Sequence, residues 1–80
     1  MQLKLKDGRV VQGTARQIVS QMRDLAQFSN AATIGDYVEY VRTNTGAFEG
    51  VSLDITGETE DEKCESLVAE LLRNELAVRL

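Results

Sequence analysis

The stretch Thr59-Glu-Asp-Glu-Lys-Cys-Glu-Ser-Leu-Val-Ala-Glu-Leu-Leu72 carries the clearest structural signal in the chain. Thr59 and Glu62 fit a T-x-x-E capping box, and acidic residues fill the first turn, where the helix dipole favours them. Such a helix is unstable alone, so the rest of the chain is expected to cover its apolar face. That face repeats at the i, i+3, i+4, i+7, i+8 spacing of an α-helix, at Cys64, Leu67, Val68, Leu71 and Leu72.

The first twelve residues predict a β-hairpin. Leu3 and Leu5 alternate with polar residues over 2–6, which is typical of a half-buried strand. Asp7-Gly8 is a strong signal for a tight turn, and residues 9–12 then return as a second strand. Because an isolated hairpin is only marginally stable, a helix is expected to pack on its apolar side.

Residues 14–44 predict two helices joined by a short loop. Thr14 and Gln17 fit a capping box, and apolar residues follow at helical spacing. Ser29-Asn30 is expected to end the first helix. Thr33 is expected to cap a second, shorter amphipathic helix, which Asn44-Thr45-Gly46 should end.

Two further segments alternate as strands do. Val51, Leu53 and Ile55 predict a third strand, because β-branched residues alternate with polar ones. Residues 75–80 are ambiguous, since Leu76 and Leu80 could extend the helical face. Val78 lies off that face, which slightly favours a C-terminal strand.

These elements predict a single α+β domain over residues 1–80. The expected order is ββααβα, with or without a strand at the C-terminal end, and with the helices on one face of a small, mostly antiparallel sheet. A C-terminal strand parallel to 51–55 would require a right-handed crossover through the preceding helix.

The composition argues against an enzyme or a metal site. The chain has one cysteine, Cys64, and no histidine, so an internal disulfide, a zinc site and a histidine-activated serine are all excluded. Cys64 is expected to be a small buried apolar residue rather than a reactive thiol. No cofactor motif is present, and neither a signal peptide nor a membrane-spanning run is evident. We therefore expect a non-enzymatic cytoplasmic protein.

The charge is acidic overall and unevenly distributed. The net charge is −4, with +2 over residues 1–45 and −6 over residues 46–80. A polarised surface of this kind could orient a protein partner or a second copy of the chain. A net acidic protein is poorly suited to bind a phosphate backbone, so nucleic acid is an unlikely partner.

The small size and the aromatic residues favour an interaction module that forms a homodimer. A domain of this size has little core and gains stability from oligomerisation. We expect the dimer to form through an aromatic and arginine patch or through an edge strand. The candidate patch residues are Phe28, Tyr40, Arg42 and Phe48.

Two other functions remain open from the sequence. The first is a nucleic-acid-associated regulator that uses basic residues of the hairpin and the first helix, namely Lys4, Lys6, Arg9, Arg16 and Arg23. The second is binding of a small ligand or a divalent cation at the acidic turn 54–62. That turn does not fit the spacing of a calcium-binding loop, so no metal ligand is assigned.

Overall fold

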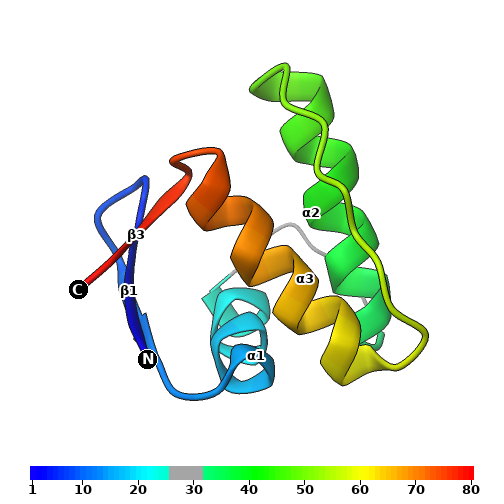
Figure 1. Ribbon diagram of the computed structural model, residues 1–80, viewed down its shortest axis with the longest axis horizontal. Helices are drawn as coiled ribbons and strands as arrows, with labels where there is room; N and C mark the ends of the chain where they lie inside the picture. Colours follow the sequence, from blue (N-terminus) through cyan, green and yellow to red (C-terminus); the bar gives the residue numbers. More distant parts are fainter. Residues whose placement is uncertain (26–31) are drawn as a thin grey trace.

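The computed structural model describes residues 1–25 and 32–80, without the side chain of Phe48, and shows an α+β domain (Figure 1). This confirms the predicted class. The described elements are β1 (Gln2–Leu5), β2 (Val10–Gln12), α1 (Ala15–Leu25), α2 (Ile34–Phe48), α3 (Glu60–Arg73) and β3 (Ala77–Arg79).

The three described strands form an antiparallel sheet in the order β2-β1-β3. Lys4 lies opposite Val10 on one side and Val78 on the other. The C-terminal strand therefore exists, and it pairs with β1 rather than parallel to residues 51–55. Glu75 has a φ of 61°, a left-handed conformation that ends α3 and reverses the chain into β3.

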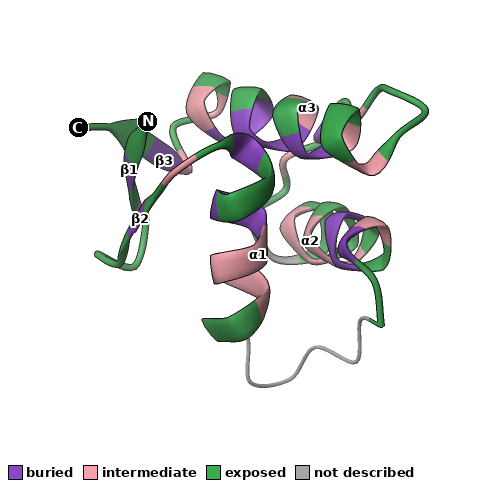
Figure 2. Ribbon diagram, turned by 90° about the horizontal axis from the view of Figure 1, so that it is seen from below, coloured by how far each residue is buried: buried purple, intermediate pink, exposed green. Residues whose placement is uncertain are grey.

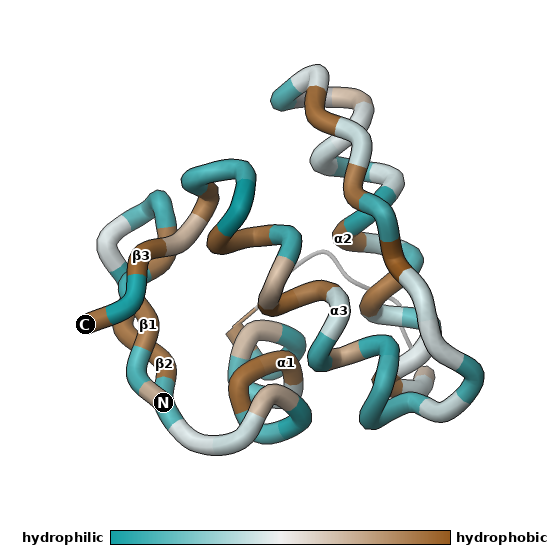
Figure 3. Tube along the Cα trace, viewed as in Figure 1, coloured by the Kyte–Doolittle hydropathy of each residue, from teal (hydrophilic) through white to brown (hydrophobic). Residues whose placement is uncertain are grey.

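All three helices lie on one side of the sheet, as the sequence predicts (Figure 2). The side chains between the two layers are buried, including Leu3 and Val11 from the sheet and Ile18 from α1. Helix α3 lies at the centre, and hydrophobic and hydrophilic positions alternate along it (Figure 3). Its capping box at Thr59 and Glu62 is present, and Cys64 and Leu67 are fully buried.

Helix α2 is longer than predicted. It begins after Thr33, whose hydroxyl accepts a hydrogen bond from the Asp36 amide at 3.1 Å, as expected. It then continues through the predicted stop at 44–46 as far as Phe48, and the Asn44 side chain donates to the Tyr40 carbonyl within the helix at 2.9 Å. The chain turns only at Gly50, where φ is +67°.

The predicted strand at 51–55 is wrong. Residues 51–57, which we call the strap, run from α2 back to the start of α3 and pair with no described strand (Figure 1). The alternation itself is correct, since Leu53 is buried and Asp54 is exposed. Two side chains of α3 take the place of a neighbouring strand. Glu70 accepts from the Asp54 amide at 2.6 Å, and the Ser66 hydroxyl accepts from Thr56 and donates to the Asp54 carbonyl.

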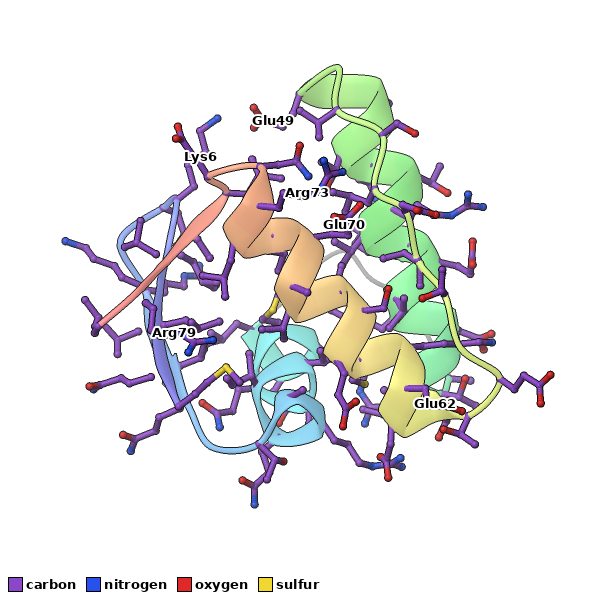
Figure 4. All side chains as sticks on the ribbon, in the orientation of Figure 1. Lys6, Glu49, Glu62, Glu70, Arg73 and Arg79 are labelled. Atoms are coloured by element: carbon purple, nitrogen blue, oxygen red, sulfur yellow. The ribbon has the colours of Figure 1, made fainter. Side chains whose placement is uncertain are left out.

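Glu70 is the buried charged residue that anchors the strap (Figure 4). It accepts hydrogen bonds from the Arg73 guanidinium and from the Asp54 amide. These contacts lower the pKa of Glu70 from 4.5 to about 2. The hydrogen bonds from Arg73 have the largest effect, and the bond from the Asp54 amide comes next. Because the folded-state pKa is the lower one, ionised Glu70 stabilises the fold above pH 4.5, and this contribution is lost as the pH falls towards 2.

We expect Glu70→Gln to lower the melting temperature by several degrees at pH 7, because the neutral amide weakens the contact with Arg73. The difference from the wild type should shrink as the pH falls from 4.5 to about 2. Thermal unfolding followed by circular dichroism over this range measures the effect. Glu65→Gln, on an exposed position of the same helix, is the control. An equal difference at every pH would contradict this role of Glu70.

Candidate functional site

The outer edge of β3 carries backbone groups that are open to a partner strand. Leu76 accepts a hydrogen bond from the Lys6 amide at 3.1 Å, and the Leu80 amide donates to Gln2 at 2.9 Å. In a strand the backbone N–H and C=O groups of successive residues point to opposite edges, so those of Leu76, Val78 and Leu80 face β1. Those of Ala77 and Arg79 face away from the sheet. Within residues 1–25 and 32–80, no hydrogen bond reaches these outward groups.

The opposite edge of the sheet, at β2, is blocked by a side chain at one of its two outward-facing residues, Gln12. The Gln21 carboxamide on α1 accepts from the Gln12 amide at 3.2 Å and donates to the Gln12 carbonyl at 2.6 Å. The side chain thus makes the two contacts that a neighbouring strand would make. A side chain in this position hinders strand addition at Gln12, so the two edges of this sheet differ in how many outward backbone groups are already bonded.

The face of the sheet that points away from the helices is exposed, and we call it the outer face. Across it Lys4 lies between Val10 and Val78, and Gln2 lies beside Gln12 and Leu80. Val10 and Val78 are each 51% exposed and Leu80 is 60% exposed. Three exposed aliphatic residues therefore lie on this face, interspersed with Lys4 and two glutamines.

A groove lies between α2 and the turns at the ends of β1 and α3. Tyr37 and Tyr40 stack at its side, with ring centroids 5.8 Å apart, and apolar residues such as Leu5 and Leu76 line it. Its volume is about 280 Å³. An ion pair between Lys6 and Glu49, at 2.6 Å, lies at its rim (Figure 4). Polar residues also line the groove, namely Lys6, Asp7, Asn44, Thr45 and Glu49, and two of them, Lys6 and Glu49, pair with each other.

The predicted interface residues are not brought to one place in the described structure. Tyr40 lines the groove, but Arg42 pairs with Glu39 at 2.9 Å and borders a different hollow, between α2 and residues 50–53. Phe28 and the side chain of Phe48 lie outside the described residues. The aromatic patch therefore remains a prediction.

Most of the basic residues proposed for nucleic-acid binding have acidic neighbours. Lys6 pairs with Glu49, Arg9 lies 3.4 Å from Asp7, and Arg16 pairs with Asp61 and Glu60 at 2.9 and 3.3 Å. Lys4 and Arg23 form no ion pair with any described residue. The candidates thus do not form one continuous basic surface.

The acidic turn 54–62 is organised by hydrogen bonds within the protein. Glu60 accepts from the Gly35 amide at 3.1 Å as well as from Arg16, and Glu62 accepts from the Thr59 amide. The contacts from Thr59 lower the pKa of Glu62. Among the described residues, no three potential ligands lie close enough together to hold a metal ion.

Cys64 is buried as predicted, and its thiol is unsuited to catalysis. Burial is the main cause that raises the pKa of Cys64; Arg16 lowers this pKa somewhat, and the acidic neighbours Asp61, Glu60 and Glu65 raise it further. The thiolate, which is the reactive form, is therefore disfavoured.

Sequence reasoning found the alternation of residues 76–80 but not the difference between the two sheet edges. That difference depends on Gln21, whose side chain reaches β2 only after α1 has packed on the sheet. In the described ranges, no helix is both long and apolar enough to cross a membrane. Comparison of the chain with models of known families, with curated proteins and with solved structures gave no match.

Proposed function

We propose that the chain is a non-enzymatic protein-interaction module that forms a homodimer by antiparallel pairing of β3 with β3 of a second copy. The observation that carries the proposal is the open edge of β3, whereas Gln21 blocks the opposite edge, β2, at Gln12. Two-fold pairing through β3 leaves two β2 edges at the ends of a six-stranded sheet, and Gln21 blocks each of them at Gln12. Assembly would therefore stop at two copies, as in a symmetric dimer.

The outward groups of Ala77 and Arg79 restrict the register of this pairing. If Arg79 lies opposite Arg79, two like charges face one another, which is unfavourable. If Ala77 lies opposite Ala77, Arg79 meets Glu75, whose φ of 61° is not extended. If Ala77 lies opposite Arg79, both pairs exchange two backbone hydrogen bonds, and the two-fold axis passes through Val78. We adopt this last register.

The same register brings apolar side chains together. Val78 then lies opposite Val78 of the other copy, in the position where cross-strand side chains are closest, and Leu80 lies opposite the backbone of Leu76, whose side chain packs in the groove. Val78 and Leu80 are exposed in the single chain, so the pairing removes apolar surface from water. Cross-strand apolar pairs contribute roughly 0.2–1 kcal/mol each. The edge is thus self-complementary in both its backbone and its side chains.

The non-enzymatic part of the proposal is supported by how the nucleophilic side chains are used. Cys64 is buried in the core, and the Ser66 hydroxyl is engaged with the strap on both its donor and acceptor sides. We also assign the protein to a reducing compartment, the cytoplasm, which is where a free thiol such as Cys64 is common.

A pair of proline substitutions tests the dimer. Arg79→Pro removes an outward amide of β3, and Val10→Pro removes an outward amide of β2; neither removes a hydrogen bond of the three-stranded sheet. We expect Arg79→Pro to raise the dimer dissociation constant about 100-fold or more, measured by sedimentation equilibrium. Val10→Pro should remain as dimeric as the wild type.

Circular dichroism must show that both variants are folded. Arg79→Ala, which removes the charge but keeps the amide, should remain dimeric and shows whether the backbone group is responsible. A folded Arg79→Pro variant that dimerises like the wild type would overturn the proposal. So would a wild-type chain that is monomeric at concentrations on the order of tens of micromolar.

A further inference from the structure

The outer face stays uncovered both in the fold and in the proposed dimer, because strand pairing at an edge leaves the faces of a sheet free. Its central residues are Lys4, Val10 and Val78, with Leu80 and two glutamines beside them. None of these residues is acidic, although the whole chain has 13 acidic and nine basic residues. The outer face is therefore an apolar surface with a positive charge on a protein that is otherwise negative.

We propose that the outer face docks an acidic amphipathic helix of a partner protein. The helix would lay its apolar side over Val10, Val78 and Leu80 and place glutamate or aspartate residues next to Lys4. A helix packed on a sheet is the usual way to cover such a face, and the α1 and α3 helices cover the inner face in the same manner. This inference extends the proposed function and does not depend on the dimer, since Lys4, Val10 and Val78 belong to one chain.

Charge and apolar exposure together favour a protein partner over other anionic partners. Lys4 is the outer-face cation without an ion pair in the described part of the chain, because Lys6 binds Glu49. Tight binding of a nucleic acid uses about 6–10 phosphate contacts, and an anionic membrane is recognised by about 4–8 clustered basic residues. One lysine among aliphatic side chains fits neither pattern. It does fit a helix that has both leucines and carboxylates.

The test uses a synthetic helical peptide of leucine and glutamate, roughly 18 residues long, titrated into the ¹⁵N-labelled full chain. We expect the amide signals of Lys4, Val10 and Val78 to shift most, and the affinity to fall as salt is added. Lys4→Glu should weaken binding at least tenfold, and Lys4→Gln should weaken it less. Lys63→Glu makes the same charge change on α3, away from the sheet, and should bind like the wild type.

The same titration with duplex DNA and with phosphatidylglycerol vesicles distinguishes the alternatives. Binding of either one in place of the peptide would overturn the proposal. No peptide binding, or peptide binding that Lys4→Glu leaves unchanged while the variant is folded, would also overturn it. The monomeric Arg79→Pro variant should still bind the peptide, so failure of the dimer and failure of this surface are separate results.

Discussion

Leu67→Ala is expected to remove a large part of the stability of this protein, about 2–5 kcal/mol. Leu67 is fully buried at the centre of α3, the helix that contacts both α1 and α2. Truncation of a buried leucine costs about 2–5 kcal/mol, because the lost side chain leaves a cavity. A domain of 80 residues has a free energy of unfolding of only about 4–12 kcal/mol. Urea denaturation at a fixed protein concentration measures the loss.

Leu25→Ala is the matched control for this prediction. Leu25 lies at the end of α1 and is 42% exposed, so the same truncation should change the free energy of unfolding by less than about 1 kcal/mol. The protein concentration must be the same for all variants, because the proposed dimerisation would add to the measured free energy of unfolding. Equal effects of the two substitutions would mean that α3 is not the centre of the core.

Gly57→Ala is expected to have the second largest effect, about 3 kcal/mol of destabilisation. Gly57 connects the strap to α3 and has a φ of +112°, which side-chain-bearing residues rarely adopt. An added Cβ would also lie 2.5 Å from the Cβ of Glu62, in the first turn of α3. The substitution therefore combines backbone strain with a steric clash against the capping box.

Gly8→Ala separates these two causes. Gly8 also has a positive φ, +94°, but an added Cβ there would meet nothing within 4 Å. We expect this variant to lose about 1–2 kcal/mol from strain alone. Chemical denaturation of both variants gives the difference. If Gly57→Ala is no more destabilising than Gly8→Ala, the close approach of the strap to Glu62 is not a constraint on the fold.

The elements that the sequence predicts well are those with local signals. The capping boxes at Thr14 and Thr59 and the cap at Thr33 fix the starts of all three described helices, and each cap is present. The Asp7-Gly8 turn connects β1 and β2 as expected. These features depend on residues a few positions apart, so they can be identified before the tertiary structure is known.

The strap shows why the remaining elements are harder to predict. Alternation at 51–55 correctly indicates that one side of the segment is buried, but it carries no information about what lies beside the backbone. Here Glu70 and Ser66 satisfy the Asp54 backbone from α3, some 12–16 residues away. In the same way, blocking of the β2 edge at Gln12 depends on Gln21, a contact between two elements with no sequence signal of its own.

The type of candidate interface was predicted from the sequence, but its location on the sheet was not. An edge strand was one of the two surfaces expected for a dimer, yet Lys4, Lys6 and Arg79 gave no reason to prefer one edge over the other. The choice of β3 follows from hydrogen bonding that exists only in the folded chain. The proposed binding surface is thus defined by backbone groups left unbonded in the described structure, rather than by a motif.

Amide hydrogen exchange at Ala77 and Arg79 tests the dimer most directly, because these are the amides that point out of the sheet. The measurement compares a protein concentration far below the dimer dissociation constant with one far above it. We predict that both amides exchange freely at the low concentration and become protected at the high one, while the Val10 amide on β2 changes little. Rapid exchange of Ala77 and Arg79 at both concentrations, in a chain whose Leu67 amide stays protected, would contradict β3 pairing.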